Sequence, residues 1–300
     1  MKVIYIMGLG RSGSTLLDVF LGNHPGMRSI GQFADFVRTA WIHSTTCSCG
    51  QLVTDCPFWS EVRERWHRYL DDHSEQEYEH LREFHERMSR GPFSIPASRL
   101  STKDFKLYIA STAALYRSAF EACEGKILVD SSKMPLRAFH LSRIPEFDLR
   151  IIHMLRDGRA VAYSWNKPAR RNARDVSRTA IDWMATNLAS EWVLRNTDAP
   201  SLRLRYEDFV DDPVKALRSI GALVDEDMDT VISRLTEDAP MHVTHVASGN
   251  QLRFQGQIRL KPDREWRTSM SDRDQRRVWT ITKPLMLRYG YSRDNDYREE

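Results

Sequence analysis

The sequence predicts an α/β fold, a P-loop-like parallel sheet flanked by helices, with a helical insertion that forms a substrate lid. The first observation is an apolar run, Val3–Met7, followed by a glycine-rich turn and an amphipathic segment from about Ser14 to Gly22. The second is a set of later β-rich runs separated by stretches long enough for crossover helices: 127–129, 149–155 and 202–206. Near-continuous apolar strands that alternate with helices indicate a parallel sheet covered on both faces.

Composition narrows the class of protein. The 300 residues are 41% hydrophobic and 28% charged, as in globular proteins. The longest apolar runs are far shorter than the roughly 20 residues of a membrane-spanning helix. A net charge of +3 is too small to indicate a nucleic-acid partner. With only Met1 and Lys2 before the first apolar run, no signal peptide is expected, and we predict a cytoplasmic protein.

The segment from about 34 to 123 interrupts the alternation of strands and helices. It contains a cysteine-rich loop, a charged run over 61–90 that predicts one or two solvated helices, a proline-containing break at 91–96 and a helix over about 104–123. Ligands bind at the carboxyl ends of strands in such sheets. We therefore expect this insertion, placed between the first two core strands of a single 1–300 domain, to overhang that edge as a substrate lid.

The C-terminal third is predicted to be mostly helical. Apolar periodicity indicates helices over 176–195, 213–224, 227–235 and 272–288. The segment 239–265 has no regular periodicity and is predicted to be irregular.

Three cysteines gather within ten residues, Cys47, Cys49 and Cys56. A structural zinc site takes four ligands, and the nearest fourth ligands in the sequence are His43 and Cys123. A disulfide or redox pair is a second alternative. Buried thiols in a compact loop are the interpretation we favour, so the sequence predicts no metal site.

The turn GLGRSGST, from Gly8 to Thr15, has P-loop spacing with Ser14 where nucleoside triphosphatases carry lysine. Backbone N–H groups and a helix N-terminus still point at an anion, and Arg11 adds a cation. The turn therefore predicts a site for a phosphate-like group without provision for a magnesium nucleotide. A purely structural strand-to-helix turn is the alternative.

Several short motifs follow one another along the chain: GRSGSTLL, LGNHPG, LVDSSK, LRDGRAVAYSW, LRYEDFVDDP, GNQLRF and IRLKPDREW. Together they resemble the sulfotransferases that use 3'-phosphoadenosine 5'-phosphosulfate (PAPS), and most of all the bacterial branch and the tyrosylprotein or carbohydrate enzymes. The resemblance extends over nearly the whole chain and is weakest from about 60 to 124.

The resemblance implies a role for each matching residue. Around the 5'-phosphosulfate it places Arg11, Ser12, Gly13, Ser14 and Thr15. It assigns the 3'-phosphate to Arg156 and Ser164, the border of the adenine to Tyr206, and a closing loop to Arg253 and Arg259. Because Arg156 ends a predicted strand and Ser164 follows eight residues later, both can face one anion if the loop folds back.

Sulfuryl transfer needs in-line geometry, cations at the leaving group and a base for the acceptor. The resemblance implies that Arg11 neutralises the leaving phosphate and that Lys133 lies near the sulfuryl group. No metal is required, and PAP is the product. The implied acceptor is a hydroxyl or amine of a small molecule such as a natural product, sulfated by a monomer or homodimer.

The base departs from the family pattern. Gln32 stands at the position of the family glutamate, and an amide cannot take a proton at neutral pH. Asp35, His43 and His153 are the nearest candidates, although His153 lies inside a predicted core strand and is expected to be a core residue. An acceptor that needs little help, or an engineered Glu-to-Gln change, would also explain Gln32.

Two other classes of function remain open. A P-loop-like nucleotide kinase is disfavoured because Ser14 replaces the lysine. A non-catalytic relative that binds PAP or another anion is supported mainly by Gln32.

Overall fold

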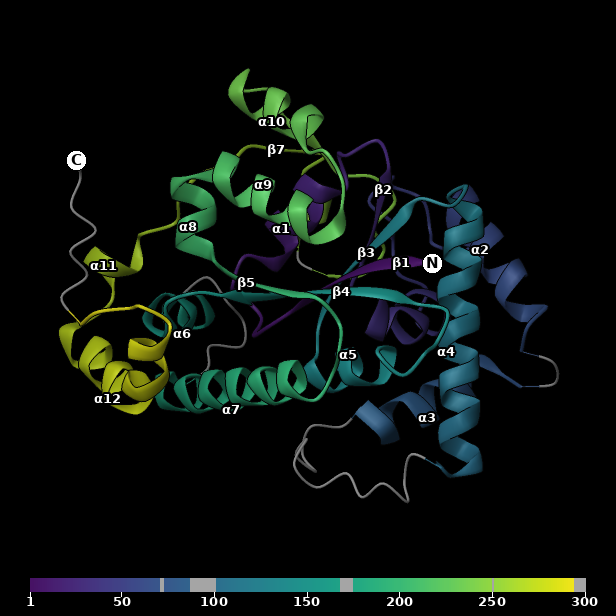
Figure 1. Cartoon of the computed structure of the whole chain (residues 1–300), viewed down its shortest axis with the longest axis horizontal. Coiled ribbons are helices and arrows are strands. Elements are labelled where there is room, and N and C mark those ends of the chain that lie inside the picture. Colours follow the sequence, from purple (N-terminus) through teal and green to yellow (C-terminus); the bar gives the residue numbers. More distant parts are fainter. Residues whose placement is uncertain (71–72, 87–100, 168–174, 250, 294–300) are drawn as a thin grey trace.

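Five parallel strands form the central sheet in the order β2-β3-β1-β4-β5. The strands are β1 (Lys2–Met7), β2 (Met27–Gly31), β3 (Ile127–Lys133), β4 (Asp148–Leu155) and β5 (Ser201–Arg205). The computed structural model describes residues 1–70, 73–86, 101–167, 175–249 and 251–293 (Figure 1). It confirms the predicted α/β class with a parallel sheet flanked by helices.

The strand β2 was not predicted from the sequence. Its residues, MRSIG, contain Arg28 and Ser29 and so form no continuous apolar run. An edge strand tolerates this composition because β2 pairs only with β3. The insertion therefore follows the second strand of the chain, which corrects the expected place directly after the first.

Alternate residues of β1 pack on opposite faces of the sheet, as the two-residue period of a strand requires. Val3, Tyr5 and Met7 belong to a core that includes residues of α4 (Lys103–Ala122) and α5 (Pro135–Leu141). Ile4 and Ile6 belong to a second core with residues of α1 (Ser14–Leu21) and α9 (Pro213–Val224). Helices cover both faces (Figure 1), which explains why β1 is apolar on both sides from Val3 to Met7.

The insertion contains η1 (Phe33–Asp35), η2 (Val37–Ile42), α2 (Pro57–His67), α3 (Glu75–Glu86) and α4. One or two helices in the charged run and a helix near 104–123 were predicted. The expectation that the charged helices are solvated is wrong for α3, because Glu75, Glu79, Arg82 and Glu86 are buried. Arg82 forms ion pairs with Glu79 and Glu86, and Glu86 also pairs with Arg137 of α5. The predicted break at 91–96 lies outside the described residues.

The C-terminal third has the predicted helices: α7 (Val176–Arg195), α9, α10 (Asp229–Thr236) and α12 (Asp272–Arg288). Short helices α6 (Gly158–Asn166), α8 (Tyr206–Asp211) and α11 (Trp266–Ser269) complete it. Between α10 and α11, the irregular segment contains η6 (Gln251–Phe254) and the two-stranded ribbon of β6 (Met241–His242) and β7 (Gln257–Ile258). Across the described ranges, no helix has the length and apolarity needed to cross a membrane.

Candidate functional site

A cavity of about 1070 Å³ lies at the carboxyl ends of the strands. Each strand contributes to it through the residues at or just after its end. After β1 comes the loop Gly10–Leu16, apart from Ser12; the other four strands contribute Gln32, Lys133, Arg156 and Tyr206. The remaining wall comes from α6 and from the segment 240–263. The described residues of the insertion do not line this cavity, so its role as a lid stays a prediction.

Close approach of neighbouring chain segments explains two glycines of the loop after β1. Gly8 has φ +148°, and a Cβ there would lie 2.4 Å from the Met154 carbonyl oxygen. Gly13 has φ +93°, and its Cβ would lie 2.6 Å from the Tyr206 ring. Any side chain at these positions would push the loop away from β4 or from Tyr206.

The loop presents a helix N-terminus to the cavity. Gly13 is the N-cap of α1 and no side chain caps the helix. The first N–H groups of a helix carry partial positive charge and bind anions. Arg11 has φ +79°, and its Nε donates to Ser164 Oγ at 3.0 Å. The loop after β1 and the helix after β4 are therefore joined at the cavity.

Arg156 is buried and held on several sides. Its Nη1 donates to the Arg11 carbonyl at 3.2 Å, and its Nη2 donates to the Asp263 carbonyl at 2.8 Å. The guanidinium lies 4.2 Å from the centre of the Tyr206 ring. Its Nε is buried without a hydrogen-bond partner among the described residues. This side chain is preorganised and retains a donor for a ligand.

Positive charge dominates the described lining. Five cationic side chains line the cavity: Arg11, Lys133, Arg156, Arg259 and Lys261. Asp263 is the carboxylate that the described lining contains, and it pairs with Arg156 at 3.2 Å. Burial alone would raise the pKa of Asp263, but Arg156 lowers it below its usual value. A cavity with this balance favours an anionic ligand with several charges.

Lys133 ends β3 with φ +74°. Its carbonyl accepts from Gly8 N at 3.0 Å, and its Nζ donates to the Ser131 carbonyl at 3.0 Å. Burial lowers the pKa of Lys133 to about 8, although the carboxylates of Asp18, Asp130 and Asp35 oppose the shift. The ammonium of Lys133 therefore loses its proton closer to neutral pH than an ordinary lysine does.

Gln32 follows β2, the strand next to β3, and is fixed through its backbone. Its carbonyl accepts from Ser248 Oγ at 2.5 Å. Its side-chain amide lies beside Gly249, where an added Cβ would be 3.2 Å from Nε2. The position singled out for the missing family base therefore does face the cavity.

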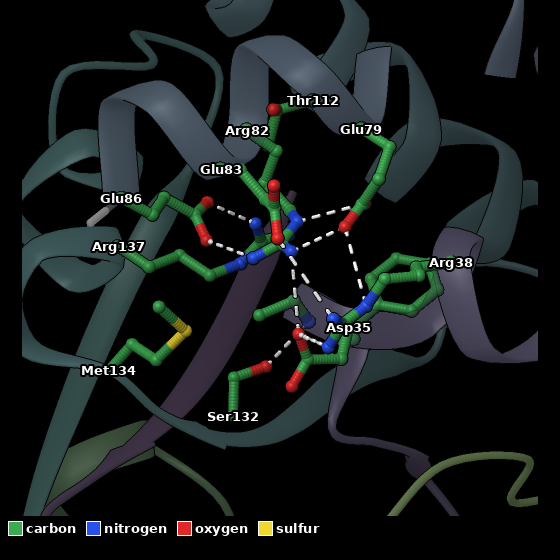
Figure 2. A network of polar contacts seen from close by, with 12 residues as sticks. Asp35, Arg38, Glu79, Arg82, Glu83, Glu86, Thr112, Ser132, Met134 and Arg137 are labelled. Carbon is green, nitrogen blue, oxygen red and sulfur yellow. Dashed lines mark hydrogen bonds and ion pairs between the residues drawn. The ribbon is translucent and has the colours of Figure 1, made fainter. Parts of the chain in front are cut away.

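The other candidate bases lie away from the cavity lining. Asp35 pairs with Arg38 at 3.1 Å and with Arg82 at 3.4 Å, as Figure 2 shows. His43 is exposed at the end of η2. His153 is fully buried with Nε2 2.9 Å from Asn187 Oδ1, and burial lowers its pKa to about 4. It is the core histidine that its strand position predicted.

Not every residue assigned to the donor lines the cavity. Ser12 and Arg253 do not, and Arg253 donates to the Gly249 carbonyl at 2.7 Å. Arg259 does, while also pairing with Asp238. Tyr206 begins α8 and does not end a strand as predicted, since β5 stops at Arg205.

Sequence reasoning missed Lys261 and Asp263 as cavity residues. Both stand in the motif IRLKPDREW, which was used for the resemblance without an assigned role for either. Alternating basic residues at positions 259 and 261 were the available signal, because in an extended segment they face the same side.

A buried ion-pair network lies where the insertion meets the core (Figure 2). Glu86 of α3 pairs with Arg137 of α5 at 2.5 Å and with Arg82 at 3.3 Å. Tyr108 of α4 also donates to Glu86 at 2.5 Å. Glu86 and Arg137 are completely buried. The network ties α3 to the helix that follows β3.

The cysteine cluster corrects another expectation. Cys47, Cys49 and Cys56 lie beside His245, and neither predicted fourth ligand, His43 or Cys123, joins them. Cys123 lies at the end of α4, where its thiol donates to the Phe120 carbonyl at 3.3 Å. All four cysteines are free thiols. A histidine 189 residues beyond Cys56 could not be selected from sequence spacing.

Comparison with known proteins identifies the family of this chain. Residues 3–230 match the sulfotransferase family model, and the chain belongs to that family. No curated protein matches the sequence.

The solved structures that resemble this chain include the sulfotransferase domain of the Synechococcus PCC 7002 olefin synthase. It is 21% identical, with a TM-score of 0.53 over 95% of this chain and 94% of that domain. The sulfotransferase domain of the curacin biosynthetic pathway is 16% identical, with a TM-score of 0.55 over 97% and 98%. A Mycobacterium avium sulfotransferase is 14% identical, with a TM-score of 0.52 over 96% and 77%. At these identities the likeness supports the fold.

Proposed function

We propose that this sulfotransferase takes its sulfuryl group from PAPS and transfers it to a hydroxyl or amine of a small-molecule acceptor, such as a natural product. The observation that carries the proposal is the cavity lined by Arg11, Lys133, Arg156, Arg259 and Lys261. It receives the N-terminus of α1, and Ser14 replaces the lysine of nucleoside triphosphatases. Such a site suits a donor with two separate phosphate groups.

The donor is proposed to lie across the ends of β1, β4 and β5. The loop from Arg11 to Thr15 would hold the 5'-phosphosulfate at the N-terminus of α1. Arg156, through its free Nε, and Ser164 would hold the 3'-phosphate, with Arg259 above them. Tyr206 would border the adenine. The contact of Arg156 with the Tyr206 ring supports neighbouring sites for these two parts of the donor.

The proposed reaction breaks the bond between sulfur and the bridging phosphate oxygen and forms a bond from sulfur to the acceptor oxygen or nitrogen. PAP leaves with the electron pair of the broken bond, and the acceptor loses one proton. Arg11 would neutralise the charge that develops on the leaving phosphate, and Lys133 the charge on the sulfuryl oxygens. The chemistry requires no metal.

This chain departs from the family pattern at the residue that would take the proton from the sulfuryl acceptor. Gln32 faces the cavity and carries no charge, Asp35 is paired with two arginines, and His43 is exposed. We propose that the preferred acceptor loses its proton without a carboxylate base, as a phenol does more easily than an aliphatic alcohol. The proton would then go to solvent, because Lys133 would act as the charged ammonium beside the sulfuryl group.

The test is a transfer assay with PAPS and a panel of phenols, aliphatic alcohols and amines, in which PAP and sulfated product are measured together. We expect both products in equal amounts without added metal, with phenols faster than alcohols. Consumption of ATP with magnesium, and none of PAPS, would replace the proposal with a nucleotide kinase. Tight PAP binding without transfer to any acceptor would leave the non-catalytic relative.

A further inference from the structure

We propose that Cys47, Cys49, Cys56 and His245 form a structural zinc site, separate from the sulfuryl-transfer cavity. One candidate ligand atom from each residue lies within 4.8 Å of all the others. Cys56 Sγ is 3.1 Å from His245 Nδ1, and Cys47 Sγ is 4.0 Å from the same nitrogen. Ligand atoms around tetrahedral zinc are about 3.5 to 3.8 Å apart, given Zn–S of about 2.3 Å and Zn–N of about 2.0 Å.

The loop that carries two of the cysteines is shaped like a small metal-binding turn. Cys47 N donates to the Gln51 carbonyl, and Gly50 N donates to the Cys47 carbonyl, both at 2.9 Å. Gly50 has φ +90°, which lets the chain reverse directly after Cys49. Thr46 and Leu52 form an antiparallel bridge that closes the turn. These bonds present Cys47 and Cys49 from one hairpin.

Cys56 follows the hairpin and is the N-cap of α2. Zinc binds the thiolate form of cysteine, so binding at Cys56 would release the proton of its thiol. Cys47 and Cys56 are buried and Cys49 is exposed. One open side of this kind gives a metal ion a route into an otherwise closed site.

His245 reaches the cysteines because backbone bonds hold its segment against the hairpin. Ser48 N donates to the Val246 carbonyl at 3.0 Å, and Val246 N donates to Ser48 Oγ at 2.9 Å. A neutral imidazole nitrogen is a common zinc ligand, and His245 Nδ1 is the atom that lies near Cys56 Sγ. The chain thus brings a fourth ligand of the right chemistry to the three thiols from a distant segment.

The charge of the site also fits. Zinc with three thiolates and a neutral histidine has a net charge of −1. Arg28 of β2 interacts electrostatically with Cys47 and Cys56, and its guanidinium lies 4.3 Å from the centre of the Phe58 ring. A partly buried anionic centre therefore has a cation beside it.

The site would fix one wall of the cavity. Val246 lies against Gly31, where an added Cβ would be 2.7 Å from Val246 Cγ1. Ser248 donates to the Gln32 carbonyl, and Gly249 lines the cavity. A metal at His245 would connect the start of the insertion to this segment, in contrast to the expectation from sequence that the chain has no metal site.

The test measures metal and does not depend on sulfuryl transfer. The full chain is purified with reductant and without chelator, and zinc per chain is measured by mass spectrometry. We expect about one zinc per chain, and about one equivalent of Co²⁺ taken up by the zinc-free protein with the absorption of a tetrahedral thiolate site. Cys47→Ser, Cys56→Ser and His245→Ala should each lose most of the metal.

Two further variants control for folding and for the thiol chemistry. Cys123→Ser removes the buried cysteine outside the cluster and should keep the full zinc content. His245→Cys retains four ligands and should keep it as well. Reduced wild type that binds neither zinc nor Co²⁺ would overturn the proposal. So would His245→Ala with an unchanged zinc content, or a disulfide within the cluster in protein purified with reductant.

Discussion

Arginines have different roles in the buried network and in the cavity. In the buried network of Figure 2, Arg82 faces Glu79 at 2.5 Å and Glu86 at 3.3 Å. In the cavity, Arg156 has Asp263 as its carboxylate partner, and Arg11 donates to the hydroxyl of Ser164. Arg82 therefore holds helices together, whereas Arg156, with Asp263 as its carboxylate partner and a buried Nε without a partner among the described residues, is available to an anion.

The same contrast explains the titration of these groups. Burial opposes charge on Arg82, but the paired carboxylates raise its pKa above the usual value. Lys133 in the cavity has its pKa lowered to about 8, because burial outweighs the nearby carboxylates. A bound anion would provide the charge that the cavity lacks. In the network, Arg38, Arg82 and Arg137 each have a carboxylate partner without any ligand, whereas we propose that the donor supplies the anionic groups in the cavity.

The largest predicted effect is on the network. Arg137→Met leaves Glu86 completely buried with one fewer cation, which should lower the free energy of unfolding by about 3 to 5 kcal/mol. Urea denaturation measures the loss. Arg38→Met is the control, because Arg38 is partly exposed and should cost no more than about 1 kcal/mol. Equal losses in the two variants would contradict the distinction between buried and exposed pairs.

The next effect concerns donor recognition. Arg156→Ala should weaken PAP binding by about 1.5 to 3 kcal/mol, the usual contribution of a hydrogen bond to a charged group. Binding of adenosine 5'-phosphosulfate, which lacks the 3'-phosphate, should change much less. Calorimetry on both ligands measures the difference, with Arg264→Ala as the control because Arg264 pairs with Asp211 outside the cavity lining. Equal losses for the two ligands would remove Arg156 from the 3'-phosphate site.

A smaller effect follows from the charge of Lys133. The ammonium is protonated below its pKa of about 8 and neutral above it, so its attraction for the donor is lost as pH rises through that value. We expect kcat/KM for PAPS to fall up to tenfold per pH unit above about 8. Lys133→Arg should abolish this fall, because arginine stays charged. A fall that persists in Lys133→Arg would assign the titration to another group.

The smallest expected change is at Gln32. On the preferred acceptor, Gln32→Glu should leave the transfer rate unchanged or lower it, because a new anion beside the sulfuryl donor repels it. Gln32→Asn is the neutral control. Transfer rates at saturating PAPS measure the effect. A rise of about 100-fold or more, the scale of general-base catalysis, would show that the cavity lacks a base that it needs.

Much of the fold could be predicted from local sequence, and the failures have physical reasons. Apolar or β-rich runs identified β1, β3, β4 and β5, whereas β2, with Arg28 and Ser29, was not recognised as such a run. Helix α3 looked solvated because its sequence is highly charged. The sequence does not show that these charges are paired with buried partners from other segments, such as Arg137. The composition of a charged helix does not reveal whether its carboxylates meet arginines from another segment.

The candidate site was predictable where motif and strand end coincide. Arg11, Gln32, Lys133, Arg156 and Tyr206 all come at or near the ends of strands, and all line the cavity. Contacts between distant segments could not be predicted from the sequence. Examples are His245 with the cysteines and Asp263 with Arg156. Such pairs depend on how the irregular segment 239–265 folds back over the sheet.

The central claim is that the cationic cavity binds a PAPS-type nucleotide without metal, and calorimetric and thermal unfolding measurements with PAP test it most directly. We expect PAP, in the presence of chelator, to bind and to stabilise the chain by roughly 2.7 kcal/mol at about 100 times its dissociation constant. ATP with magnesium should give a much smaller stabilisation. Stabilisation by magnesium and ATP without any by PAP would contradict the claim.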